Sequence, residues 1–240
     1  MNAFMCEWGD SSDAERKGPS RPHILNLPLE IIVNIVKLVD QSEWVNLAMV
    51  NTQFRAAVIL CLRPLTNVTL SRFLKPARGF EAENHVIFIL EAVIRARFLM
   101  VPASILPAIR SQVASCLSRL KHLKSLDLSG CVIREGVLCK LLQNLPQLEE
   151  LSLRGAYIPT SPSDYDQSTL LFMLQVLKEP KSFSFRSLRT IRKQVIEQII
   201  TLKRLKKLDV YECCTARDVL GTLISKLPEL MELAIQFQLP

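Results

Sequence analysis

The chain of 240 residues has few aromatic side chains, few glycines and no long apolar run. Aromatics make up 6% of it, so the core is expected to be mainly aliphatic. Its longest apolar candidate, residues 86–94, is interrupted by Glu91 and falls well short of the roughly 18 residues that a membrane span needs. The N-terminus lacks the basic start and apolar segment of a secretory signal. These absences predict an intracellular protein, cytoplasmic and/or nuclear, without membrane association.

Sequence signatures of catalysis are also missing. Seven scattered glycines form no phosphate-binding loop, and neither H-E-x-x-H nor G-x-S-x-G occurs. Three histidines and seven cysteines show no zinc-ligand spacing. Cys213 and Cys214 have no nearby histidine, so buried positions suit them better than nucleophilic ones. We expect no enzymatic activity, no metal, no cofactor and mostly buried, reduced thiols.

The length of 240 residues predicts one or two domains, and a hydrophobic content of 49% indicates a globular chain. Charge is distributed unevenly along it. The formal net charge is +7, and residues 181–207 hold nine lysines and arginines against Glu197 alone. This basic segment has three interpretations: a solvated face, a site for an acidic or phosphorylated partner, or a nucleic-acid contact. Sparse aromatic residues for base stacking make nucleic acid the least favoured.

The first 61 residues predict a tail followed by three short helices. Residues 1–22 mix polar residues and proline without periodicity, which is typical of a disordered tail. Pro28 suits the first turn of a helix, Asp40 suits the start of a second and Asn51 or Thr52 that of a third. Helices within residues 23–61 are too few to bury all their apolar side chains, so a partner is expected to cover the remainder.

The order of residues in this region resembles the F-box motif without a gap. The matching positions are Leu27, Pro28, Glu30, Ile31, Ile32, Ile35, Val36, Val39, Asp40, Glu43, Leu47, Ala48, Val50, Asn51, Phe54 and Arg55. Trp44 stands where the family usually has leucine, and Phe54 stands where tryptophan is common; both keep apolar bulk. The resemblance implies a domain at residues 23–61 that binds a Skp-family adaptor and, through it, a cullin. The expected adaptor-binding residues are Leu27, Pro28, Ile31, Ile32, Ile35 and Leu47.

A second pattern, L-x-x-L-x-x-L-x-L, recurs downstream. Units that start at Leu120 and Leu145, and at Leu202 and Leu227, are each 25 residues apart. A further unit that fits the pattern well starts at Leu62, a weakly fitting one at Val93 and a degenerate one at Leu177. The last two apolar residues of each unit are two apart and predict a short strand. The expected strand centres are Val68, Leu99, Leu126, Leu151, Phe183, Leu208 and Leu233.

Between these strands, the sequence predicts helices at residues 136–144, 168–178, 188–201 and 216–226. A stacked strand and helix of about 25 residues is typical of a leucine-rich-repeat solenoid. Cys131 and Cys213 follow their strands at a turn, as in the cysteine-containing subtype often joined to F-boxes. The predicted fold is therefore α/β, a small three-helix F-box followed by a leucine-rich-repeat domain at residues 62–240. A generic α/β domain is the alternative.

Strand residues that flank the buried leucines are expected to face a concave surface. Among them, Arg186, Lys207 and Tyr211 are expected to group beside the basic segment, with Asp209 and Arg154 nearby. An aromatic ring beside cations suits an acidic or phosphorylated target. The polar insertion at residues 157–167 predicts a surface loop in which Ser161-Pro162 is a candidate phosphorylation site.

The sequence therefore favours a substrate-recognition adaptor of an SCF-type ubiquitin ligase. The F-box would bind the Skp-family adaptor, and the repeats would bind a target protein. The alternative is a non-catalytic repeat protein that acts outside ubiquitin transfer or binds an anionic ligand.

Overall fold

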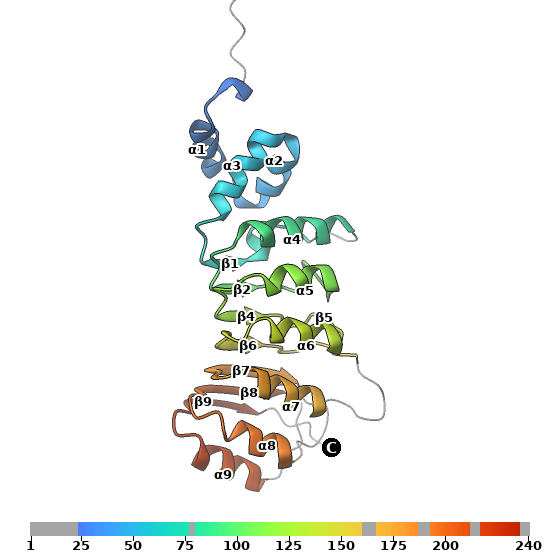
Figure 1. Ribbon diagram of the computed structural model, residues 1–240, viewed down its shortest axis with the longest axis vertical. Helices are drawn as coiled ribbons and strands as arrows, with labels where there is room; N and C mark the ends of the chain where they lie inside the picture. Colours follow the sequence, from blue (N-terminus) through green and yellow to red (C-terminus); the bar gives the residue numbers. More distant parts are fainter. Residues whose placement is uncertain (1–23, 77–79, 160–166, 187–192, 212–216, 236–240) are drawn as a thin grey trace, which may run out of the picture.

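The computed structural model describes residues 24–76, 80–159, 167–186, 193–211 and 217–235. The molecule is elongated, with a helical unit at one end and stacked strand–helix units along the rest of the long axis (Figure 1). The tail predicted at residues 1–22, Cys213 and Ser161 lie outside the described residues.

The helical unit consists of 3₁₀ turns and three α-helices. In chain order its elements are η1 (Ile24–Asn26), α1 (Leu29–Leu38), η2 (Gln41–Glu43), α2 (Trp44–Val50) and α3 (Thr52–Leu62). Pro28 precedes α1, and its carbonyl accepts the amides of Ile31 and Ile32. Asn51 caps α3 by accepting the Phe54 amide at 2.9 Å. Asp40 accepts the Ser42 amide instead, so a 3₁₀ turn comes before α2.

Parallel strands and helices alternate along the rest of the chain. The main strands are β1 (Asn67–Thr69), β2 (Phe98–Met100), β4 (Ser125–Asp127), β6 (Glu150–Ser152), β7 (Ser182–Arg186), β8 (Lys207–Tyr211) and β9 (Glu232–Ile235). The helical elements are η3 (Leu70–Arg72), α4 (Phe80–Ala92), α5 (Ser111–Ser118), α6 (Glu135–Gln143), α7 (Gln167–Val176), α8 (Lys193–Ile199) and α9 (Arg217–Lys226). The helices α4–α9 cover the opposite side of the stack from the strands (Figure 1).

The strands form one 7-stranded sheet in the order β1-β2-β4-β6-β7-β8-β9, and every neighbouring pair is parallel. The predicted strand centres are confirmed, because each pairs with the next. Their register is Val68↔Leu99, Leu99↔Leu126, Leu126↔Leu151, Leu151↔Phe183, Phe183↔Leu208 and Leu208↔Leu233. The degenerate units at Leu99 and Phe183 therefore form strands as regular as the others.

Successive units are also joined by a carbonyl ladder just before each strand. The Arg97 carbonyl accepts the amides of both Lys124 and Ser125, at 2.7 and 2.9 Å. The same double acceptance repeats at the carbonyls of Thr66, Lys124, Glu149, Lys181 and Lys206. Each unit is thus held at the same offset from the one before it.

The buried leucines of the repeat frame form the core. Leu120, Leu123, Leu126 and Leu128 are each at most 1% exposed, and the corresponding residues of the next unit are equally buried. Leu233 in β9 is half-buried, because it belongs to the last described strand and has a neighbouring strand on one side only. The predicted helices agree with α6, α7 and α9 within about two residues, and with α8 over its described part.

A buried turn follows each of two central strands. Gly130 and Gly155 adopt positive φ angles of 73° and 64°, which glycine tolerates best. The next residue, Cys131 or Ala156, is buried as the sequence predicted. The Cys131 thiol donates to the carbonyls of Val101 and Leu106, at 3.3 and 3.4 Å, and so links the turns of neighbouring units. Strand β5 (Val132–Ile133) follows the first of these turns and pairs with β3 (Ala108–Ile109) in a second, 2-stranded sheet that the sequence analysis did not predict.

The helical unit and the solenoid share one core, which runs from Ile32 to Leu227. At the junction, Lys75 pairs with Glu43 at 2.6 Å, and the Arg55 guanidinium lies 4.8 Å from the centre of the Phe88 ring. The first repeat units therefore cover part of the apolar surface that three short helices cannot bury among themselves.

Candidate protein-interaction surfaces

Helix α1 keeps part of its apolar surface exposed. Ile31 is 45% exposed and Leu38 is 88% exposed, while Ile35 between them is half-buried. These three residues share a face because they are spaced by four and three positions. Pro28 is exposed, whereas Leu27 and Leu47 are half-buried against the core.

Ile32 was also expected to bind the adaptor, but the structure places it in the core. Its side chain is 0% exposed, because that face of α1 packs against α3 and belongs to the shared core. Val36, one turn further along, is equally buried. Ile32 therefore positions α1, and in this conformation it is not accessible to a partner.

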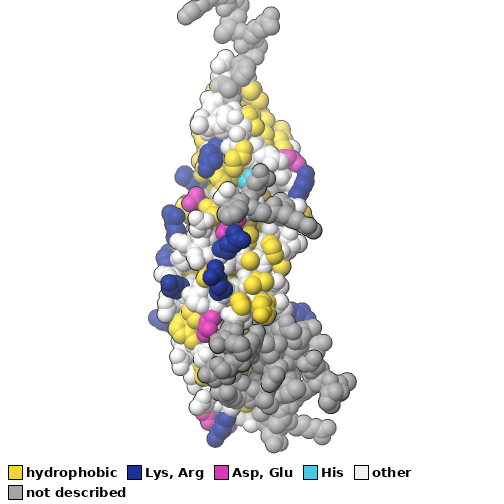
Figure 2. Space-filling model, turned by 90° about the vertical axis from the view of Figure 1, so that its right-hand side faces the viewer, with side chains coloured by type: hydrophobic (Ala, Val, Ile, Leu, Met, Phe, Trp, Pro, Cys, Tyr) yellow, Lys and Arg dark blue, Asp and Glu magenta, His cyan; other side chains and the backbone are white. Residues whose placement is uncertain are grey.

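Further apolar side chains are exposed on the other helices of this unit. They are Met49 and Val50 on α2, at 51% and 65%, and Leu60 on α3, at 42%. Figure 2 shows hydrophobic side chains gathered over this end of the molecule. Large exposed apolar patches are typical of protein–protein contact sites.

The strand face is the second candidate surface. In each main strand from β1 to β8, the residues before and after the buried central residue are exposed or half-buried. Most are small or polar, such as Ser125, Ser152 and Ser184. Strand β2 instead presents Phe98 and Met100, two half-buried residues that the sequence analysis did not single out. The same repeat frame, applied to the unit at Val93, would have found them.

The structure brings together some of the predicted target-binding residues. The Arg154 Nε lies 3.7 Å from the Asp209 Oδ2. This contact connects two units of the solenoid. Arg186 and Tyr211 end β7 and β8 and are register partners. Placement of their side chains lies outside the described part of the structure.

Lys207 does not belong to this group, contrary to the sequence-based expectation. It begins β8 whereas Tyr211 ends it, and four residues of strand span about 13 Å. The Lys207 Nζ instead lies 2.7 Å from Glu232 Oε1 of the next strand. Both described strand-face cations, Arg154 and Lys207, thus already lie beside carboxylates.

The described cations of the basic segment mostly brace neighbouring units. Lys181 Nζ lies 2.5 Å from Glu149 Oε2, and Arg204 pairs with Glu179 at 2.5 Å. Lys203 donates to the Lys226 carbonyl at 3.0 Å. These contacts join residues 23 to 32 positions apart, so they link one repeat to the next. Much of the described basic segment therefore links stacked units of the solenoid.

Glu149 contacts two lysines of neighbouring units. Its two carboxylate oxygens accept from Lys124 and Lys181, each at 2.5 Å. Hydrogen bonds from Lys124, the larger cause, and from Lys181 lower the pKa of Glu149 from 4.5 to about 2. The carboxylate is therefore ionised at neutral pH and holds three successive units together.

The described cysteines are mostly buried thiols of low reactivity. Cys61, Cys116 and Cys131 are buried free thiols, and Cys139 is half-buried. Burial raises the pKa of all four, to about 12 for Cys131. Within the described ranges no three His, Cys, Asp or Glu side chains gather as metal ligands would. Nor does any described helix have the length and apolarity to cross a membrane.

Comparison with known protein families decides the nature of the helical unit. Residues 24–63 match the F-box domain. This segment contains α1, α2 and α3, together with the exposed aliphatic residues on them. F-box domains bind Skp-type adaptors, so the match supports a Skp-type partner and an SCF-type adaptor role in general.

Comparisons beyond the F-box are weak. A Bacteroides fragilis protein of known crystal structure shares 13% identity at a TM-score of 0.39, over 60% of this chain and 43% of its own. The chain thus spans less than half of that protein. The actin-binding site 2 of leiomodin-1 shares 13% identity at a TM-score of 0.35, over 87% and 90% of the two chains. Both TM-scores are too low to indicate a function for this chain. No curated protein matches the sequence.

Proposed function

We propose that the protein is a substrate-recognition adaptor of an SCF-type ubiquitin ligase. The match of residues 24–63 to the F-box domain carries this proposal. The exposed aliphatic residues of α1, chiefly Ile31 and Leu38, support it, because they offer an apolar surface to a partner.

The solenoid is proposed to be a leucine-rich-repeat domain that holds the target protein. Its 25-residue frame and parallel strand stack support this assignment. No bond is made or broken by this chain in the proposed role. It acts by proximity: a target on the repeats and a ubiquitin-charged enzyme at the cullin have a high effective concentration for each other.

The strand face is the proposed target-binding surface. Its small serines leave room for an incoming chain, and Phe98 and Met100 supply apolar side chains that suit an interface anchor. Arg154 with Asp209, and Lys207 with Glu232, present paired charges of both signs. A target of mixed charge fits these pairs better than a uniformly acidic one. The acidic or phosphorylated target expected from the sequence then depends on Arg186 and Tyr211.

Co-purification of the Skp-type adaptor and cullin tests the F-box part of the proposal. The informative variant is Ile31→Glu, which changes an exposed side chain of α1. Ile94→Glu is the matched control, because Ile94 is 53% exposed outside the F-box segment. Loss of the adaptor from Ile31→Glu but not from Ile94→Glu supports the assignment, and equal recovery contradicts it.

The alternative is a repeat protein that uses the adaptor outside ubiquitin transfer. Recovery of the adaptor without cullin, together with target levels that do not respond to proteasome inhibition, would favour it. The remaining alternative is a repeat protein that binds an anionic ligand. It has less support, because most described cations of the basic segment already contact neighbouring units.

A further inference from the structure

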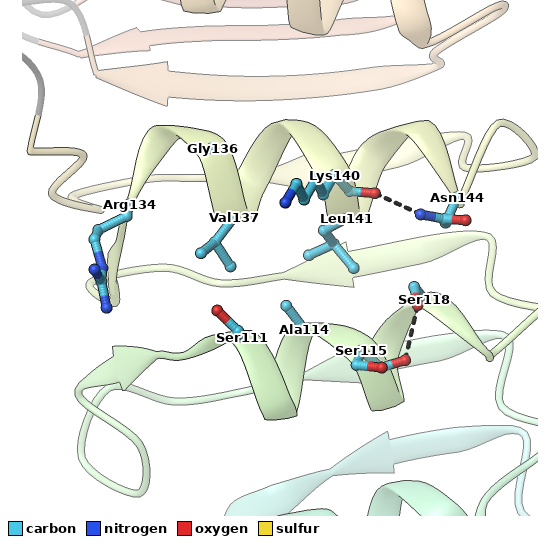
Figure 3. A pocket seen from close by; sticks show the side chains of 10 residues that line it. All are labelled: Ser111, Ala114, Ser115, Ser118, Arg134, Gly136, Val137, Lys140, Leu141 and Asn144. Carbon is cyan, nitrogen blue, oxygen red and sulfur yellow. Dashed lines mark hydrogen bonds between the residues drawn. The ribbon is translucent and has the colours of Figure 1, made fainter.

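The helix side of the solenoid contains a groove between α5 and α6 (Figure 3). Its volume is about 470 Å³, within the range of ligand-binding clefts. Ser111, Ser115 and Ser118 line the α5 side, and Gly136, Lys140 and Asn144 line the α6 side. Ala114, Val137 and Leu141 lie between the two helices and form an apolar floor.

The space between the neighbouring helices α4 and α5 is smaller than the groove between α5 and α6, and a side chain spans it. Between α4 and α5 the cavity is about 180 Å³, and Arg119 spans it to Glu91 at 3.9 Å. Between α5 and α6, Lys121 links the C-terminal ends by donating to the carbonyls of Ser118 and Asn144. Small side chains therefore leave the length of this groove open.

The groove is also positively charged. Arg134 and Lys140 are both exposed on its lining, and none of its lining residues is acidic. Among the residues that the structure describes, no carboxylate pairs with either cation. This differs from the basic segment, where Lys181, Arg204 and Lys207 each lie against a carboxylate.

We propose that the groove between α5 and α6 binds a short acidic segment of a partner protein. One apolar side chain of that segment packs on Ala114, Val137 and Leu141. Its carboxylates accept hydrogen bonds from Arg134 and Lys140, and charge complementarity therefore selects the partner. A nucleic acid fits less well, because the lining holds only two cations and no aromatic side chain for base stacking.

This docking site lies on the helix side, whereas the proposed target surface is the strand side. It does not depend on the F-box assignment. A partner in the groove would be bound at the same time as an adaptor and a target, which gives the solenoid two separate binding faces.

Gly136 provides a direct test, because it lines the groove and a side chain can be added there without a steric clash at its Cβ. A Cβ built on Gly136 meets no atom within 4 Å, and its φ is not in the left-handed region. Gly136→Trp should therefore block the groove. Gly221→Trp is the matched control, since Gly221 lies on α9 with the same freedom.

The charge of the groove is tested with Lys140→Glu, and Lys226→Glu on α9 is its control. Lys226 is an exposed helical lysine away from the groove. Circular dichroism establishes that the four variants keep the parent fold.

Binding is measured by the fluorescence anisotropy of a labelled peptide of repeated Glu-Leu-Glu-Glu units on the full chain. We expect the parent to bind this peptide at least about tenfold more tightly than the same peptide with glutamine for glutamate. Gly136→Trp and Lys140→Glu should each weaken binding by about tenfold or more, and the controls by less than about twofold. The proposal is overturned if Gly136→Trp binds like Gly221→Trp, if the glutamine peptide binds equally well, or if the parent binds neither peptide below about 1 mM.

Discussion

The indole ring of Trp44 lies 5.9 Å from the ring of Phe73, centre to centre, at an interplanar angle of 48°. Trp44 belongs to the F-box and Phe73 to the first repeat unit, so this contact joins the two parts of the protein. The Trp44 Nε1 also donates to the Val39 carbonyl at 3.1 Å, and both rings are at most 5% exposed. The departure of Trp44 from the usual F-box leucine is thus explained by the neighbour that this solenoid supplies.

The first prediction concerns this junction. Trp44→Leu should lower the free energy of unfolding by about 1–3 kcal/mol, because it removes the ring contact and the indole hydrogen bond. In a double-mutant cycle with Phe73→Leu, the coupling energy should be about 0.5–1.5 kcal/mol. Urea denaturation of the four proteins provides the measurement. Strictly additive effects would show that the two rings stabilise the protein independently.

The second prediction separates surface from core on α1. Ile31→Glu should leave the midpoint of unfolding almost unchanged while it weakens adaptor binding, because Ile31 is 45% exposed. Ile32→Ala should instead cost about 2–5 kcal/mol of stability, as expected for a fully buried isoleucine. Adaptor affinity and chemical denaturation of both variants test this division. If Ile31→Glu were the less stable of the two, the orientation of α1 would have to be revised.

The third prediction concerns the strand face. The double variant Arg186→Glu, Tyr211→Ala should lose captured target proteins, because the two residues are register partners on the strand face. It should keep the adaptor, because both positions lie outside the F-box. Affinity purification followed by mass spectrometry, at low and high salt, measures the loss. A matched variant, Lys193→Glu, changes a helix-side lysine and should retain the targets. An unchanged set of partners with no salt dependence would exclude this corner as the recognition site.

The fourth prediction concerns pH. The folded-state pKa of Glu149, about 2, lies below its ordinary value of 4.5. Its stabilising contribution is therefore fully present above about pH 5 and is lost as the pH falls from there toward 2. Because this carboxylate is partly exposed to solvent, we expect the contribution to be about 1 kcal/mol or less.

Glu149→Gln should remove this part of the pH dependence and should leave stability at low pH nearly unchanged. Thermal unfolding of the parent and the variant between pH 2 and 7 gives the comparison. If the two proteins lose stability in parallel over this range, the brace from Lys124 and Lys181 does not stabilise the fold.

The repeat frame could be predicted from sequence because it imposes a requirement on every unit. A residue such as Leu126 must be buried between its neighbours Leu99 and Leu151, so an aliphatic or aromatic side chain recurs at the same position of each unit. Even the degenerate unit around Phe183 keeps this pattern and therefore keeps the register.

Features that depend on how far a side chain reaches, or on how a helix is rotated about its axis, could not be predicted in the same way. Ile31 and Ile32 look alike in sequence, and only the packing of α1 on α3 decides which one is buried. The Arg154–Asp209 contact joins residues 55 positions apart in sequence, across an intervening unit. The 2-stranded sheet of β3 and β5 has strands of two residues each, too short for any periodicity to reveal.

The carbonyl ladder has a mechanical consequence. Its hydrogen bonds connect one unit to the next, and the units are stacked along the long axis of the molecule (Figure 1). Tension between the two ends therefore loads the unit interfaces in series, and each interface carries the full force. Bonds aligned with the pull break a few at a time, so a stretched solenoid would peel apart unit by unit rather than rupture in one event. A protein built in this way yields to traction at its weakest interface while the remaining units stay stacked.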